Sequence, residues 1–599
     1  MTSKGWPRFL ACILAISIPL GIVLFWHFLN RTYPRGDQGF FFDITQQIYR
    51  VFRTEGFLQG LGGAYSIRGG YKPLLIPVFG VPFIALFGGR VPQTIGATES
   101  CLFALFLIYA FQMAREFTTP LKAILLVICI GTVPWVLINA YYYNMEAAFL
   151  AFTMAGLFHL KRAPRFESRL HGALFGIFLG LCFCCRPIET ALFFLPALAV
   201  IVGVAFKNRL VTSRELLGSA VVLVIGIFCL TVAIRGGEQY SVSKAAPLLA
   251  GLPVVVILNV LLTRRKGLPV SGFSLAFSLA FSIAVLWALP SMYYIYFWAY
   301  GCSFGKYAVS TGLRLDPVTG KWATPPAAFF FETIRFLGTS LLPCGVVAAI
   351  IGMRHWSRKT DFLRSHAPFA ACILLMVFVP IIIGSFTYNV DRRYYYTSGL
   401  VLMFCCSWVI AKYAPVLFLI PIALQSYFVC ADSYHLTWQR IPQSVSELID
   451  LKWPDFYEVP RFHRADPTKA FVQAVEESVK TAERPHVAIL LYGNIDWGWL
   501  LHPMTLPILE SELNLTTKFG QLYPDQTISL NLAMSKVHEE MLNQKFNYAV
   551  LGNELYTRMQ ESNQLNRGFF LVRQIEAANY DEKAQSYWLV GVRPAFQSQ

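Results

Sequence analysis

Side chains that could perform acid–base or phosphate chemistry stand in a long segment between the first two apolar stretches. It contains Asp37 and Asp43 in an aromatic-rich run and, further on, Tyr71 and Lys72 directly before Pro73. A carboxylate can accept a proton, and a lysine held by a rigid proline at the membrane boundary can bind an anion. Charged residues in a loop are often only solvated, but long loops between ordered elements are usually functional.

Further charged residues stand where apolar stretches begin or end. Glu146 follows a tyrosine-rich run, Arg186 ends an apolar stretch, and Arg392 and Arg393 precede another. Ionisable groups beside hydrocarbon are costly and tend to line a cavity or pathway. The alternative for Glu146 is a structural carboxylate that only reaches out to the membrane interface.

Carboxylates and cations on one membrane face would suit a particular kind of reaction. A carboxylate can take the proton of an acceptor hydroxyl, while Lys and Arg stabilise a phosphate as it leaves. Glycosyl transfer from a lipid-phosphate sugar needs both groups at a membrane surface.

The elements that must position these residues are apolar helices. Hydrophobic residues make up 55% of the 599 residues and charged residues 14%, against roughly a quarter charged in soluble domains. Residues 74–89 are apolar but short and contain Pro77 and Pro82, so we expect them to be interfacial, re-entrant or fused to a neighbouring span. Since a spanning helix needs about 20 apolar residues, the sequence predicts about thirteen spans: 9–29, 95–113, 121–140, 147–160, 170–185, 188–206, 216–234, 247–262, 273–296, 333–352, 367–386, 397–411 and 413–429.

The basic residues indicate how these spans are directed. With the N-terminus inside, and with 74–89 not crossing, the Lys and Arg clusters around 115–122, 161–169, 207–214, 264–266, 354–364 and 412 all fall in inner loops. This is the positive-inside pattern, so the net charge of +16 is not interpreted as a nucleic-acid-binding surface. Segments 30–71, 141–146, 301–332, 388–393 and the whole C-terminal tail are then expected on the outer side.

The tail has the composition of a globular domain. Helical spacing over 469–482 and 530–544 alternates with strand-like runs at 487–492, 548–551, 569–572 and 587–592. This alternation predicts a small α/β domain. It contains no phosphate loop, nucleotide-binding glycine motif or catalytic-triad signature, so a structural or acceptor-binding role is expected.

Taken in order, these motifs resemble those of the GT-C fold integral-membrane glycosyltransferases. The branch in question contains the protein O-mannosyltransferases and the lipid A aminoarabinose transferases. The resemblance is carried by Asp37-Gln38, Lys72-Pro73-Leu74, Glu146, Arg186-Pro187 and Arg393-Tyr394. The chain departs from the family pattern in three ways: Gln38 replaces a second carboxylate, Tyr71 replaces an acidic or polar residue, and the second proline after Lys72 is lacking. The Trp-Trp-Asp signature of oligosaccharyltransferases is absent, which argues against transfer of a preassembled oligosaccharide to asparagine.

The resemblance implies an architecture and a localisation. Residues 1–430 would form a mainly α transmembrane domain, with the first outer loop at 30–73, and residues 431–599 an extracytoplasmic α/β domain. The expected localisation is a bacterial inner membrane, with the C-terminal domain in the periplasm.

The resemblance also implies an activity. An inverting transferase would move a sugar from a polyprenyl-phosphate donor to a hydroxyl of a lipid, glycan or protein among membrane lipids. Its site residues would be Asp37 as the base, Glu146 to orient a substrate, and a set that contacts substrate or phosphate: Lys72, Arg392, Arg393, Arg186, Tyr71 and Asp43. For Arg186, a structural role at the helix end is an equal alternative. The sequence identifies no cofactor with certainty; a divalent cation, if used, would be bound by Asp37 and Glu146.

Other functional classes stay open at this stage. A transporter or flippase for lipid-linked glycans also places charged residues on membrane helices, although no inverted repeat is found. An O-antigen ligase or polymerase is disfavoured by the early Asp and Lys-Pro loop, and a non-catalytic scaffold is the simplest alternative. The sequence specifies neither the sugar, the acceptor, the organism nor the oligomeric state.

Overall fold

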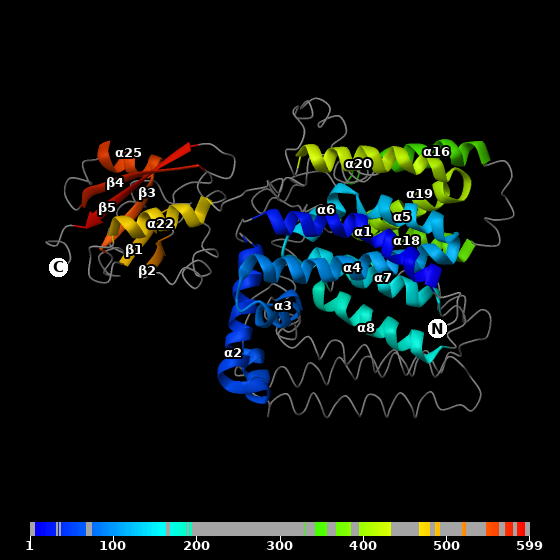
Figure 1. Ribbon diagram of the computed structural model, residues 1–599, viewed down its shortest axis with the longest axis horizontal. Coiled ribbons are helices and arrows are strands. Elements are labelled where there is room, and N and C mark those ends of the chain that lie inside the picture. The colour runs from blue at the N-terminus through cyan, green and yellow to red at the C-terminus, as the bar shows by residue number, and fades with distance from the viewer. Residues whose placement is uncertain are drawn as a thin grey trace. The chain divides into compact units, whose positions relative to one another are not determined.

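The computed structural model forms two compact units, one helical and one containing a β-sheet, which are described in turn (Figure 1). It describes residues 6–30, 34, 37–66, 75–162, 168–186, 189, 190, 192–194, 327, 330, 342–355, 367–384, 395–432, 467–479, 486–490, 518–522, 547–561, 569–578 and 584–592.

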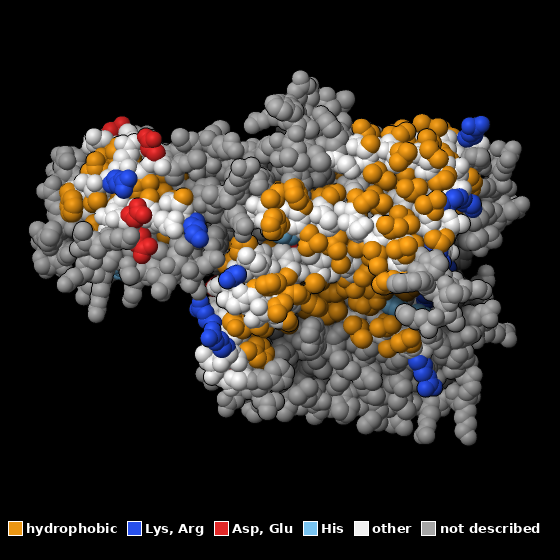
Figure 2. All heavy atoms as spheres, in the orientation of Figure 1, with side chains coloured by type: hydrophobic (Ala, Val, Ile, Leu, Met, Phe, Trp, Pro, Cys, Tyr) orange, Lys and Arg blue, Asp and Glu red, His pale blue; other side chains and the backbone are white. Residues whose placement is uncertain are grey.

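Three of the described helices are long and apolar enough to cross a membrane. They are α1 (Trp6–Leu29, apolar over Phe9–Leu29), α4 (Val91–Phe117) and α19 (Tyr396–Tyr413). They coincide with the predicted spans 9–29, 95–113 and 397–411. Hydrophobic side chains cover much of the visible face of these helices, as expected of an integral membrane protein (Figure 2).

Shorter helices occupy most of the other predicted spans that the structure describes, and one of them, α3 (Leu75–Leu86), lies in the segment 74–89, whose failure to cross the membrane stays a prediction. The predicted spans from 216–234 to 273–296 lie outside the described residues, and only a few residues of 188–206 lie within them. The total of thirteen spans therefore stays a prediction. The shorter helices are α3 (Leu75–Leu86), α7 (Met145–Lys161), α8 (Arg169–Cys185), α16 (Leu342–His355), α18 (Ala367–Gly384) and α20 (Leu419–Asp432), the last preceded by the 3₁₀ turn η4 (Pro415–Phe418).

The predicted continuous span 121–140 is corrected by the structure. It is broken into α5 (Pro120–Gly131) and α6 (Pro134–Tyr141), which meet at an angle of 67°. Pro134 has no backbone N–H and disfavours helical backbone at the preceding residue, and Val133 is extended. At the break, the hydroxyl of Thr132 donates a 3.1 Å hydrogen bond to the side-chain carbonyl of Gln425 on α20.

The segment after the first span, expected as a loop over 30–73, is helical over residues 37–66. Helix α2 runs over Asp37–Ser66, and Gly56 interrupts its helical backbone with a φ of +77°, a conformation that favours glycine. Phe41, Ile44 and Ile48 are buried, at the i, i+3, i+7 spacing of one helical face.

The second unit contains a five-stranded mixed sheet of order β2-β1-β3-β5-β4. Strand β1 (His486–Leu490) is parallel to β2 (Lys518–Leu522) and β3 (Tyr548–Gly552), whereas β5 (Ala584–Val592) is antiparallel to β3 and β4 (Phe569–Ala578). Phe471 of α22 (Pro467–Val479) packs on Tyr587, and α25 (Asn553–Glu561) follows β3.

The four predicted strands and the predicted helix at 469–482 are present, in part with different ends, whereas β2 was not predicted. The predicted helix 530–544 lies outside the described residues. The domain boundary at 430/431 and the outer location of the tail stay predictions.

Candidate functional site

Glu146 is buried at the start of a helix inside the apolar unit. Helix α6 ends at Tyr141, a turn follows, and Glu146 lies in the first turn of α7 after the N-cap residue Asn144. All residues of α6 and most of α7 are buried, and the exposed fraction of Glu146 is 2%. A helix N-terminus is a favourable place for a carboxylate because its backbone N–H groups carry partial positive charge.

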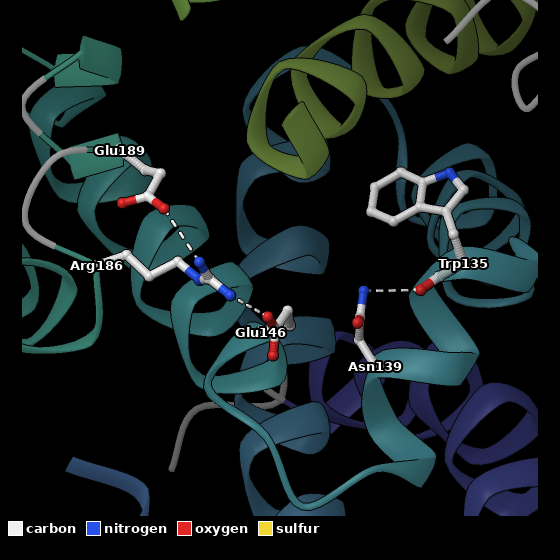
Figure 3. Close-up of polar contacts among 5 residues, drawn as sticks. All are labelled: Trp135, Asn139, Glu146, Arg186 and Glu189. Atoms are coloured by element: carbon white, nitrogen blue, oxygen red, sulfur yellow. Dashed lines mark hydrogen bonds and ion pairs between the residues drawn. The ribbon is translucent and has the colours of Figure 1, made fainter. Parts of the chain in front are cut away.

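Arg186 joins this carboxylate to a second one. Arg186 caps the C-terminus of α8, where its backbone N–H bonds to the Cys182 carbonyl at 2.8 Å. Its guanidinium donates through Nη2 to Glu146 Oε1 and through Nη1 to Glu189 Oε1, the latter at 3.0 Å (Figure 3). One cation therefore bridges two carboxylates from different segments.

Little of this cluster is in contact with solvent. The exposed fractions of the side chains are 14% for Arg186, 2% for Glu146 and 13% for Glu189. Desolvation of buried ions costs several kcal/mol each, and loss of one partner leaves the other charge uncompensated. Such a cluster is weak evidence for stability.

Glu99 of α4 is an acidic residue that the sequence interpretation missed. It is fully buried, interacts electrostatically with Glu146, and lies by the backbone of Asn144. Neither of its carboxylate oxygens has a well-formed hydrogen bond among the described residues. An ionisable residue inside a predicted span was the available signal, because such residues are functional candidates by default.

Helix α6, which precedes the turn into Glu146, also contacts α19. Asn139 donates a 2.8 Å hydrogen bond from its side-chain amide to the Trp135 carbonyl (Figure 3). The Trp135 ring stacks on Tyr396, the first residue of α19, with ring centroids 5.0 Å apart. Tyr396, which follows Arg392 and Arg393 in the chain, therefore packs on the helix that leads to Glu146.

Two of the predicted site residues, Glu146 and Arg186, are brought together by the structure. Asp37 is the first residue of α2 and Asp43 lies further along it; both belong to the compact unit that contains the sheet, not to the unit that contains Glu146. The remaining predicted positions lie outside the described residues: Tyr71, Lys72, Arg392 and Arg393.

The described residues do not form a metal centre by themselves. Among them, no group of three or more His, Cys, Asp or Glu side chains is arranged to hold a metal ion. One oxygen of Glu146 is already paired with Arg186. The hypothesis of a cation shared by Asp37 and Glu146 stays a prediction.

The chain was compared with protein families, with curated protein sequences and with solved structures. No protein-family model and no curated protein sequence matches the chain. Three of the solved structures to which this chain is similar are described next.

One similar structure is the archaeal oligosaccharyltransferase AglB from Archaeoglobus fulgidus in complex with an inhibitory peptide and a dolichol-phosphate. It is 12% identical, with a TM-score of 0.41 over 98% of this chain and 74% of that chain. Another is ArnT from Cupriavidus metallidurans in the apo state, 14% identical, with a TM-score of 0.40 over 100% of this chain and 99% of that chain. A third is ArnT from the same organism bound to undecaprenyl phosphate, 15% identical, with a TM-score of 0.38 over 99% of each chain. Similarity at this level assigns no residue role and no substrate.

Proposed function

We propose that this chain is an inverting glycosyltransferase that moves a sugar from a polyprenyl-phosphate donor to an acceptor hydroxyl on the outer face of the membrane in which it lies. The observation that carries the proposal is the Glu146–Arg186–Glu189 cluster, buried at helix ends in an apolar unit. The ordered motifs from Asp37 to Arg393 support it. A structural role alone would be met more cheaply by apolar side chains of similar volume.

Each step has a residue assigned to it in this proposal. Asp37 accepts the proton of the acceptor hydroxyl, and the hydroxyl oxygen attacks the anomeric carbon. The bond from that carbon to the phosphate oxygen breaks, and polyprenyl phosphate leaves with the bonding electrons. Lys72, with Arg392 or Arg393, stabilises the negative charge that develops on the phosphate.

Glu146 orients a substrate, and Arg186 holds Glu146. Because Arg186 already bridges two carboxylates, we favour this positioning role over the phosphate-binding role that the sequence also allowed. Asp43 and Tyr71 are assigned to the surrounding surface that contacts substrate.

The decisive experiment is an assay with purified protein and short-chain polyprenyl-phosphate sugars, which measures release of polyprenyl phosphate and the anomeric configuration of the product. We expect inversion. Asp37→Asn should lower turnover by about 10²- to 10⁴-fold, because the amide cannot accept the proton. Glu55→Gln, which removes an exposed charge from the same helix, is the control and should leave turnover near normal. Retention of configuration, or near-normal turnover of Asp37→Asn, would remove Asp37 as the base.

Donor binding tests the phosphate assignment separately. Lys72→Ala should weaken binding of a short-chain polyprenyl phosphate by roughly tenfold to a hundredfold, which is the value of one charge-assisted contact. Lys72→Arg should still impair turnover, because a planar guanidinium does not replace a compact ammonium in a fitted pocket. Unchanged affinity in Lys72→Ala would shift the role to Arg392 and Arg393.

The proposed orientation can be tested by labelling. About thirteen spans with an inside N-terminus place Asp37, Glu146 and the domain 431–599 on the outer side, which is the periplasm in a bacterial inner membrane. Single cysteines in the tail should react with a membrane-impermeant reagent in intact cells. Reaction only after the membrane is breached would overturn the orientation and the outer-face chemistry.

A transporter or flippase for lipid-linked glycans is the second candidate. The observation that favours it is the broken span formed by α5 and α6, since interrupted helices often line transporter sites. Movement of a labelled lipid-linked sugar across proteoliposomes without any transfer product would support this candidate over the enzyme.

A further inference from the structure

Tyr143 joins two elements to the turn that leads into Glu146. Its hydroxyl lies 2.9 Å from the Thr45 hydroxyl of α2 and donates to the backbone carbonyl of Ile76 in α3 at 3.2 Å. The Tyr143 and Thr45 side chains are both fully buried. A buried hydroxyl held by two partners fixes the turn more firmly than apolar contact alone would.

The space around this hydroxyl is tightly filled. A Cβ atom added at Gly80 of α3 would meet the Tyr143 hydroxyl and would come within 2.9 Å of the Thr45 methyl group. Glycine at position 80 therefore allows α3 to approach the turn closely. The hydroxyl has one defined place, between α2 and α3.

The position of the turn in the chain gives this contact its significance. Tyr143 lies between the end of α6 and the first turn of α7, so it directly precedes Asn144 and Glu146. Thr45 lies on α2, the helix that begins at Asp37. Tyr143 also interacts electrostatically with Glu99, which in turn interacts with Glu146.

We propose that Tyr143 is a positioning residue whose hydroxyl, through Thr45 and Ile76, holds the Glu146 turn against α2 and α3. We call these two hydrogen bonds of the Tyr143 hydroxyl the tie. In the proposed glycosyl transfer, on which this role rests, the tie would keep the Glu146 carboxylate in place during turnover. Tyr143 itself touches no reacting atom.

The experiment combines conservative variants with a readout that needs no substrate. Tyr143→Phe and Thr45→Val each remove a hydroxyl and preserve shape, whereas Thr45→Ser keeps the hydroxyl. Tyr142→Phe, at the neighbouring tyrosine, is the matched control. In each purified variant, the reaction of the Glu146 carboxyl with a hydrophobic carbodiimide is followed by peptide mass spectrometry, and thermal unfolding is recorded to verify folding.

We expect carbodiimide to modify Glu146 several-fold faster in Tyr143→Phe and Thr45→Val, with no such change in Thr45→Ser or Tyr142→Phe. Transfer should fall about tenfold in each of the two hydroxyl-deleting variants, and the double variant should be no worse, because both changes break one tie. The loss should appear mainly in kcat rather than in KM for the donor.

The outcomes separate this inference from the proposed function. Unchanged modification of Glu146 in both folded hydroxyl-deleting variants overturns the tie, whether or not transfer is found. Faster modification in a protein that transfers no sugar supports the tie and overturns the transferase. Multiplicative losses of transfer in the double variant would show that the two hydroxyls act independently, which also contradicts the tie.

Discussion

The two ends of the α7–α8 pair hold polar groups of very different kinds. At one end, Arg186 bridges Glu146 and Glu189, with each side chain at most 14% exposed. At the other end, His159 Nδ1 lies 2.9 Å from His171 Nδ1, and His159 Nε2 lies 3.1 Å from the Tyr109 hydroxyl. The helices are the same, but one end holds buried full charges and the other a hydrogen-bonded imidazole pair.

The surroundings of the two ends explain this difference. Near the histidines, the ion pair of Arg162 and Glu116 is partly solvated, with side chains 47% and 23% exposed. Charges there keep much of their hydration, as expected for the basic inner loops. The opposite end keeps its charges away from water at a desolvation cost. The charges near Glu146 are therefore held at a desolvation cost that the partly solvated charges near His159 do not carry.

The largest expected effect concerns transfer by the Glu146 variant. Glu146→Gln keeps the shape of the side chain but removes the charge that faces Arg186, so transfer should fall by about 10²- to 10³-fold. His171→Gln, at the opposite end of the pair, is the control and should transfer at a near-normal rate. Transfer is measured as release of polyprenyl phosphate. Equal losses in the two variants would contradict the hypothesis that only the end of the helix pair near Glu146 takes part in transfer.

The next effect is on stability at the same end. Arg186→Gln leaves two buried carboxylates without their shared cation, so the free energy of unfolding should fall by about 3–5 kcal/mol. The double variant Glu146→Gln, Arg186→Gln should recover part of this loss without recovering transfer. Equilibrium unfolding in detergent measures both, and a cost below about 1 kcal/mol for Arg186→Gln would show that water screens the pair.

A smaller effect is expected at the histidine end. His159→Phe keeps an aromatic ring stacked on Phe178, whose ring centroid lies 5.7 Å from that of His159. It loses the imidazole contacts with His171 and with the Tyr109 hydroxyl. The free energy of unfolding should fall by roughly 1–3 kcal/mol, with transfer unchanged. A large loss of transfer in a folded His159→Phe protein would give this end a function as well.

The smallest effect is expected for the partly solvated ion pair. Arg162→Gln should lower the free energy of unfolding by less than about 1 kcal/mol, because solvent screens the pair with Glu116. The difference should shrink as salt concentration rises. Lys161→Gln is a neighbouring control without that ion pair, and a salt-independent cost above that of Arg186→Gln would reverse the proposed order of the two ends.

Several elements were predictable because their signals are local. The length and composition of an apolar stretch can be judged without knowing which residues pack against it. These two properties predicted the spans at 9–29, 95–113 and 397–411 and the strand near 487. The break at Val133 also had a local signal in Pro134, but the length of the apolar run concealed it. Helix α2 had a periodic apolar face that its polar composition obscured.

Other features had no such local signal. The sequence alone placed Glu146 and Arg186 as charges at helix ends, since hydropathy marks where a helix meets the membrane boundary. Only the tertiary structure paired them across 40 positions of sequence and placed Glu99 and Tyr143 beside the same turn. The reason is physical: burial of a helix depends on a property summed along a short stretch, whereas an ion pair depends on a distance that the packing of α4, α7 and α8 decides.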